Sequence, residues 1–183
     1  MPYLILDRDG VINHDSDEYI KNPEEWQPIP GSLKAIARAN RAGFRIIVVT
    51  NQSGLGRGYF DINTLNAIHK KMHQKLARMG GGIDAIFFCP HHPDDGCDCR
   101  KPKPGMLEAI RDRLNISLQK VMFVGDTMAD IQAARAAGAI PVLVRTGKGE
   151  RTLVENNDLT DVHIYPDLAA CIDEMLKEHE VNR

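Results

Sequence analysis

The sequence has no long hydrophobic run, few aromatic residues and almost no net charge. Its longest aliphatic stretches, at 46–49 and 139–144, are far shorter than the about 20 apolar residues of a membrane-spanning helix, so no membrane partner is expected. Aromatic residues make up 5% of the 183 residues, and the formal net charge is −2. A basic field and a basic aromatic surface are therefore both lacking, and binding to nucleic acid is not expected.

The start of the chain also lacks the pattern of a targeting segment. Acidic residues that look functional begin at Asp7, too early for a cleavable signal peptide. We therefore expect a cytoplasmic protein, and we expect it to be a monomer.

Five short, nearly continuous apolar runs predict the strands of a parallel sheet that is covered on both faces. They lie at 3–6, 44–49, 85–89, 121–124 and 142–144. Five helical patterns separate them or follow the last run. The first is a helix capped by Ser32 that runs to Gly43, and the fourth covers 129–137 and ends at Gly138. The other three are apolar stripes, formed by Leu65, Ile68, Met72, Leu76 and Met79, by Met106, Leu107, Ile110 and Leu114, and by Leu168, Cys171, Ile172, Met175 and Leu176.

This alternation of strands and helices predicts one α/β domain over residues 1–183, with a doubly wound, mainly parallel sheet and helices on both faces. Only about 25 residues separate Asp9 from the helix after Ser32, so there is no room for a large cap domain. Ligands of such sheets bind beyond the carboxyl ends of the strands.

Carboxylates stand at two of those strand ends. Asp7 and Asp9 follow the first apolar run, and Asp126 and Asp130 follow the fourth. Hard oxygen ligands of this kind suit Mg²⁺, which leaves coordination positions free for phosphate oxygens. Four carboxylates at strand ends therefore indicate a Mg²⁺-dependent site for phosphoryl transfer.

Two further segments carry groups that bind phosphate. The second apolar run ends in hydroxyl and amide side chains at Thr50, Asn51, Gln52 and Ser53, and the segment 100–105 places cations next to the start of a helix. All four segments fall at the predicted carboxyl ends of strands, where we expect them to meet in one site.

Three of the four cysteines lie within eleven residues, which favours a metal site over disulfides. Cys89 with His91, and Cys97 with Cys99, form two close pairs of ligands joined by a polar loop. Such pairs suit a closed tetrahedral zinc site with three cysteines and one histidine. His92 is an alternative ligand, because the spacing alone does not choose between the two histidines.

Taken in order, Asp-x-Asp at 7–9, Thr50, Lys101 before a proline, and Gly-Asp-x-x-x-Asp at 125–130 resemble the haloacid dehalogenase superfamily of phosphotransferases over nearly the whole chain. The resemblance implies that Asp7 is the nucleophile and forms an aspartyl-phosphate, and that Asp9 is the general acid and base. Dehalogenases of this family have no need of an acid at Asp9, so a phosphatase is favoured.

The resemblance also implies the remaining ligands of the site. Thr50 and Lys101 bind the transferring phosphoryl group, and Mg²⁺ is held by Asp7, the backbone carbonyl of Asp9 and Asp126. Asp130 supports the metal from outside its ligand shell. For the structural zinc, the resemblance prefers His91 to His92, beside Cys89, Cys97 and Cys99.

Several segments resemble heptose 1,7-bisphosphate phosphatases within the superfamily, and these are LDRDGVIN, VVTNQSG, CPHH, CDCRKPKPGM, VGDTMADIQAA and LVRTGKG. The implied activity removes the C7 phosphate of D-glycero-D-manno-heptose 1,7-bisphosphate on the route to ADP- or GDP-heptose for lipopolysaccharide. Histidinol-phosphate phosphatases share the zinc loop and are the nearest alternative. A 3′-phosphatase for nucleic acid ends and a non-catalytic zinc-stapled binding module are further alternatives.

In the resembled family, substrate contacts come from two segments that here hold Asn13, Asp15, Ser16, Asp17, Tyr19, Asn51, Gln52 and Ser53. Arg100, beside Lys101, is expected to bind a second, non-reacting phosphate, and Arg145 and Lys148 add cations nearby. The choice between Asp15 and Asp17 for the sugar hydroxyls, and the preferred anomer, stay open.

Overall fold

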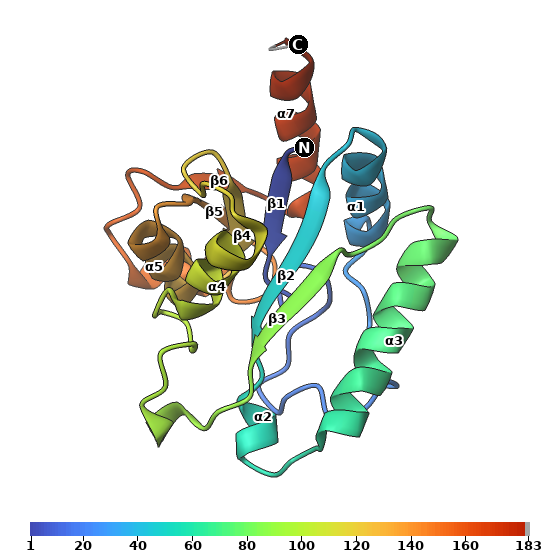
Figure 1. The fold of residues 1–183 in the computed structure, drawn as a ribbon, viewed down its shortest axis with the longest axis vertical. Helices are drawn as coiled ribbons and strands as arrows, with labels where there is room; N and C mark the ends of the chain where they lie inside the picture. Colours follow the sequence, from blue (N-terminus) through green and yellow to red (C-terminus); the bar gives the residue numbers. More distant parts are fainter. Residues whose placement is uncertain (182–183) are drawn as a thin grey trace.

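A computed structural model of the protein describes residues 1–181 and contains one six-stranded parallel sheet (Figure 1). Its strands are β1 (Tyr3–Leu6), β2 (Arg45–Asn51), β3 (Ala85–Cys89), β4 (Met122–Gly125), β5 (Ile140–Val144) and β6 (His163–Tyr165). The spatial order is β3-β2-β1-β4-β5-β6. The chain runs outward from β1 to β3, then returns to β4 on the other side of β1. Strand order therefore reverses between β1 and β4, the place where doubly wound sheets bind ligands.

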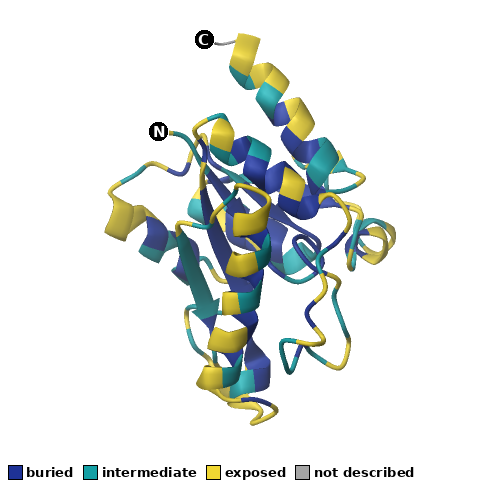
Figure 2. Ribbon diagram, turned by 90° about the vertical axis from the view of Figure 1, so that its right-hand side faces the viewer, coloured by how far each residue is buried: buried dark blue, intermediate teal, exposed yellow. Residues whose placement is uncertain are grey.

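Helices cover both faces of the sheet. They are α1 (Ser32–Arg41), α2 (Ser53–Gly56), α3 (Ile62–Arg78), the 3₁₀ turn η1 (Pro93–Asp95), α4 (Gly105–Leu114), α5 (Met128–Ala137), α6 (Gly149–Glu155) and α7 (Leu168–Val181). Side chains of β1 alternate between the two cores: Leu4 and Leu6 pack with α1, α3 and α7, whereas Ile5 packs with α4 and α5. The strands β1, β2, β4 and β5 are mostly buried, whereas the outer helix surfaces are exposed (Figure 2). This arrangement confirms the predicted fold class.

The register of the central strands brings their carboxyl ends level. Leu6 pairs with Val48 on one side and with Val124 on the other. The backbone N–H of Asp7 then donates to the carbonyl of Val124 over 2.8 Å. Residues that follow β1, β2 and β4 therefore meet at one edge of the sheet.

The segment between β1 and α1, residues 7–31, contains no helix or strand and packs directly on the domain. Trp26 is fully buried in the core on the α1 side. Lys71 on α3 donates from Nζ to the carbonyl of Trp26 over 2.8 Å. The segment is thus tied down as a loop, and no cap domain is inserted there. None of the helices within residues 1–181 combines the length and the apolar character of a membrane span.

Four local expectations are wrong. Ser32 does not cap α1: Gly31 takes the capping position with φ of 87°, and the Ser32 hydroxyl instead donates to the carbonyl of Ile12 over 2.7 Å. The same helix ends at Arg41 rather than at Gly43. Met79 and Leu114, both expected on buried stripes, are 43% and 36% exposed because they lie at or just beyond the last turn of their helices.

Candidate active site

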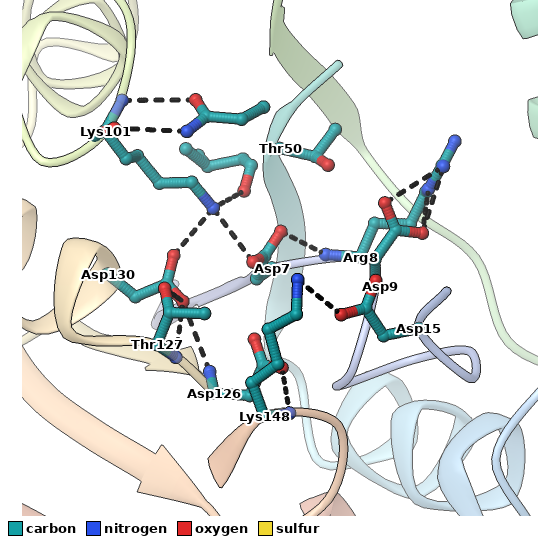
Figure 3. Close-up of polar contacts among 12 residues, drawn as sticks. Asp7, Arg8, Asp9, Asp15, Thr50, Lys101, Asp126, Thr127, Asp130 and Lys148 are labelled. Carbon is teal, nitrogen blue, oxygen red and sulfur yellow. Dashed lines mark hydrogen bonds and ion pairs between the residues drawn. The ribbon is translucent and has the colours of Figure 1, made fainter. Parts of the chain in front are cut away.

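Asp7 and Lys101 form the centre of the site, at the carboxyl end of β1 (Figure 3). Nζ of Lys101 lies 3.0 Å from Oδ2 of Asp7, and it also donates to the carbonyl of Val49 on β2 over 3.0 Å. The same ammonium lies 2.6 Å from Oδ1 of Asp130. Although burial lowers the pKa of Lys101, the carboxylates of Asp130 and Asp7 raise it further, so the side chain stays charged.

Asp130 connects this centre to the start of α5. Its Oδ2 accepts hydrogen bonds from the backbone N–H groups of Asp126 and Thr127 and from the Thr127 hydroxyl. Oδ1 remains for Lys101. One carboxylate thus caps a helix and orients the lysine at the same time.

Asp126 sits in a narrow cradle made by backbone. Side chains at Gly10 or Gly147, which have φ of 81° and 59°, would collide with its carboxylate. Its Oδ2 accepts from the backbone N–H of Lys148 over 2.7 Å, and its carbonyl accepts from the Thr152 hydroxyl over 2.8 Å. Glycine is required at both positions because it leaves space for the carboxylate and adopts positive φ without strain.

The carboxylates of Asp7, Asp126 and Asp130 place one oxygen each within 4.8 Å of one another. Burial, with repulsion from Asp130 and Asp9, raises the pKa of Asp7 to about 7 against the attraction of Lys101. Burial and the charges of Asp130 and Asp7 raise the pKa of Asp126 to about 9. Crowded, buried carboxylates of this kind form an oxygen donor set that fits a hard dication such as Mg²⁺.

Asp9 is held by donors on several sides. Arg8 donates to it from Nε and Nη2, each over 3.1 Å, and Asn13 donates to Oδ1 over 2.8 Å. Gln52 shares its amide between Oδ2 of Asp9 and the hydroxyl of Thr50. Asn13, for which a substrate contact was predicted, is fully buried outside the cavity lining, and its amide donates to Asp9.

These groups line a cavity of about 350 Å³ at the edge of the sheet. Its walls are formed by Asp7, Asp9, Asp15, Ser16, Asp17, Tyr19, Ile20, Thr50, Asn51, Gln52, Ser53, Arg100, Lys101, Asp126, Thr127, Ala129 and Lys148. All the predicted catalytic and substrate-binding residues except Asn13 are therefore brought together in one cavity.

Two features of the cavity rim distinguish residues that the sequence left equivalent. Nη1 of Arg100 is buried and has no hydrogen-bond partner among residues 1–181. Nζ of Lys148 lies 3.1 Å from Oδ2 of Asp15 and 3.7 Å from Oδ1 of Asp17, but the Asp15 side chain is 20% exposed and the Asp17 side chain is 90% exposed. Arg145 is absent from the lining and instead pairs with Glu150. At the rim, one guanidinium nitrogen of Arg100 therefore lacks a partner within residues 1–181, and Asp15 is the less exposed of the two acids.

Cys89, His91, Cys97 and Cys99 gather at the end of β3, with their ligand atoms within 4.8 Å of one another. Nδ1 of His91 lies 3.5 Å from the sulfur of Cys89 and 3.2 Å from that of Cys99. His92 is turned away, and its Nδ1 accepts from the backbone N–H of Asp94 at the start of η1. Three thiols and one imidazole so close together fit a tetrahedral zinc ion, and this set contains His91.

Three residues that support the site, Arg8, His69 and Thr152, were not predicted from the sequence. Arg8 and His69 are 61 positions apart in sequence yet lie within hydrogen-bonding distance. Thr152 lies on α6, beyond the last of the predicted motifs in the sequence, and its hydroxyl donates to the carbonyl of Asp126. No local pattern marks such residues, because their partners come from other segments.

Comparisons with known proteins agree with this geometry. A family model of haloacid dehalogenase-like hydrolases matches residues 3–138. The D-glycero-beta-D-manno-heptose-1,7-bisphosphate 7-phosphatase of Pseudomonas putida is 56% identical over 176 residues, which is 96% of this chain and 100% of that protein. The enzyme of the same name from Bordetella bronchiseptica is 53% identical over 178 residues, which is 97% of this chain and 99% of that protein.

A solved structure is similar over the same length. The crystal structure of D,D-heptose 1,7-bisphosphate phosphatase from B. bronchiseptica, complexed with magnesium and phosphate, superposes with a TM-score of 0.96 at 53% identity and covers 97% of this chain and 99% of that chain. The family model and the full-length similarities lead to one assignment. The chain belongs to the haloacid dehalogenase-like hydrolases.

Proposed function

We propose that the protein is a Mg²⁺-dependent phosphatase that removes the C7 phosphate of D-glycero-D-manno-heptose 1,7-bisphosphate. The observation that carries this proposal is the full-length similarity to enzymes of that name, one of which was solved with magnesium and phosphate. The cavity supports it, because a nucleophilic carboxylate, an ammonium group and an unpaired guanidinium face one space.

In the proposed reaction, Asp7 attacks phosphorus, and the bond between phosphorus and the sugar oxygen breaks as the aspartyl-phosphate forms. Asp9 delivers a proton to the leaving sugar oxygen. It then takes a proton from the water that attacks the aspartyl-phosphate, so that Asp7 is regenerated and inorganic phosphate leaves. Lys101 and the Thr50 hydroxyl stabilise the charge on the transferring oxygens.

Metal ions complete the proposed site. Asp7, Asp126 and the backbone carbonyl of Asp9 would hold Mg²⁺, with Asp130 supporting the site through Lys101 and Thr127. The ion would supply positive charge that lets an anionic nucleophile approach an anionic phosphate. Zinc, held by the cysteine and histidine cluster, would stiffen the segment that leads directly into Arg100 and Lys101.

Substrate selection is assigned to the rim of the cavity. Arg100 would bind the second phosphate, since its buried Nη1 has no protein partner among residues 1–181. Asp15 would accept hydrogen bonds from sugar hydroxyls, because its side chain is 20% exposed whereas that of Asp17 is 90% exposed.

The test compares Asp7→Asn with the unaltered protein on a panel that contains heptose 1,7-bisphosphate and histidinol phosphate. The amide retains the shape of the side chain but loses the negative charge, so turnover should be abolished while the circular dichroism spectrum is unchanged. The heptose bisphosphate should give the highest kcat/KM. Near-normal turnover by Asp7→Asn, or a preference for histidinol phosphate, would contradict the proposal.

A further inference from the structure

Behind Asp9 lies a buried chain of polar contacts that the reaction described above does not use. The Arg8 side chain is fully buried, with Nε and Nη2 directed to the carboxylate of Asp9. Its third nitrogen, Nη1, lies 3.2 Å from Nε2 of His69 on α3. The guanidinium therefore contacts the carboxylate of Asp9 on one side and the imidazole of His69 on the other.

His69 is built to accept this hydrogen bond. His69 is 8% exposed, and its ring packs edge-on against the ring of Phe88 on β3, with the ring centroids 6.5 Å apart. Burial, and then the positive charge of Arg8, lower the pKa of His69 to about 3. The imidazole is thus neutral at physiological pH, and Nε2 offers a lone pair to the permanently charged guanidinium.

We propose that His69 is a positioning residue: by accepting from Nη1 of Arg8, it fixes the guanidinium plane whose other nitrogens hold Asp9 at the cavity. The inference rests on the proposed role of Asp9 as proton donor and acceptor. His69 itself does not line the cavity. It acts on the reaction through Arg8.

The energetic reason is that Arg8 has no access to water. Removing the imidazole leaves a buried N–H of a charged group without a partner, which is more costly than losing an exposed hydrogen bond. The guanidinium would then rotate toward other hydrogen-bond acceptors. Both of its hydrogen bonds to Asp9 would be lost together. Asn13 and Gln52 would still donate to Asp9, but neither forms a charged, bidentate contact as Arg8 does.

The experiment separates proton delivery from general damage by changing the leaving group. A sugar alkoxide needs a proton from Asp9 to leave, whereas the nitrophenolate of 4-nitrophenyl phosphate does not. Rapid-quench single-turnover measurements with Mg²⁺ give the rate of aspartyl-phosphate formation from each substrate. The ratio of the two rates within one variant is independent of how much of that protein is folded.

We expect His69→Leu to slow aspartyl-phosphate formation from heptose 1,7-bisphosphate by about 10-fold or more, and from 4-nitrophenyl phosphate by less than about threefold. His69→Gln, whose amide oxygen reaches the place of Nε2, should restore most of the ratio. His73→Leu is the matched control, since His73 lies one turn further along α3 and is exposed. That variant should leave both rates unchanged.

Equal losses with both substrates in His69→Leu, or a His69→Gln variant no better than His69→Leu, would show a packing role only and overturn the inference. Asp9→Asn serves as the reference for the proposed function. If Asp9→Asn shows the leaving-group dependence and His69→Leu does not, the inference fails alone. If Asp9→Asn lacks that dependence, the assignment of Asp9 fails and the inference fails with it.

Discussion

Asn51 and Lys101 exchange two hydrogen bonds across the site. The Asn51 amide nitrogen donates to the carbonyl of Lys101, and its Oδ1 accepts from the backbone N–H of Lys101, each over 3.1 Å. The end of β2 therefore fixes the backbone of a residue 50 positions away. Since Nζ of Lys101 contacts both Asp7 and Asp130, a small shift of that backbone would displace the ammonium from the two carboxylates.

Asn51→Ala should lower kcat for every phosphate monoester by roughly 10–100-fold, because misplacement of an aligned catalytic group has an effect of this size. Steady-state kinetics with heptose 1,7-bisphosphate and with a simple monophosphate measure it. Asn66→Ala, on the exposed face of α3, is the control and should have no effect. A loss seen only with the bisphosphate would assign Asn51 to substrate binding instead.

Arg100 and Lys101 are adjacent, but alanine substitutions of the two residues should have different effects on bisphosphate and monophosphate substrates. Arg100→Ala should lower kcat/KM for heptose 1,7-bisphosphate by roughly 10–1000-fold, the effect of losing a charge-assisted contact, and should lower it much less for a monophosphate. Lys101→Ala should depress both. Arg145→Ala removes a cation that lies outside the cavity lining and should change neither. Equal losses on both substrates in Arg100→Ala would refute a second-phosphate site.

The cysteine cluster should retain about one zinc per chain after gentle purification. Cys97→Ser or Cys99→Ser should lower both the zinc content and the unfolding temperature, because a ligand of the loop is lost. Metal analysis by mass spectrometry and thermal denaturation measure the two effects. Cys171→Ser, a buried cysteine outside the cluster, should retain its zinc. Stoichiometric zinc in a Cys89, Cys97 and Cys99 triple serine variant would place the metal elsewhere.

Stabilisation by Mg²⁺ should increase with pH. The folded protein raises the pKa of Asp7 to about 7 and that of Asp126 to about 9, so between their ordinary values near 4 and these values the metal-free folded state binds more protons than the unfolded chain. The free energy of unfolding without metal therefore falls as pH rises through this window. Mg²⁺ must displace the same protons, which is easier at high pH.

Thermal denaturation at pH 6 and pH 8.5, with and without Mg²⁺, measures this effect. The rise in unfolding temperature caused by the metal should be larger at pH 8.5. Asp126→Asn loses the carboxyl with the more strongly raised pKa and keeps that of Asp7, so most, but not all, of the difference between the two pH values should vanish. A metal effect independent of pH in the unaltered protein would contradict the assignment of these carboxylates as ligands.

The central strands and the strand-end motifs were predictable because both are local. A short apolar run followed by Asp7, Thr50 or Asp126 indicates both the strand and the place where it ends. β6 was missed because His163 and Ile164 are exposed and this edge strand carries no apolar run. Its place is set by pairing with β5, which only the folded sheet supplies.

The supports of the site were not predictable for the same reason. Nothing around His69 distinguishes it from His73, four residues later, until Arg8 is placed against it. Likewise, Asn51 looks like a phosphate ligand in the sequence, yet its amide is used to hold Lys101. Roles of this kind depend on pairs of residues that are distant in the chain.

The cradle of Asp126 has a consequence for the order in which the protein can be made. Asp7, the proposed nucleophile, is synthesised long before Lys148 and Thr152, whose backbone N–H and hydroxyl hold Asp126. The match to the family model ends at residue 138, before either support. A nascent or truncated chain that stops there would hold every proposed catalytic side chain and still lack the supports of Asp126, so we expect catalytic competence only after Thr152 has been made.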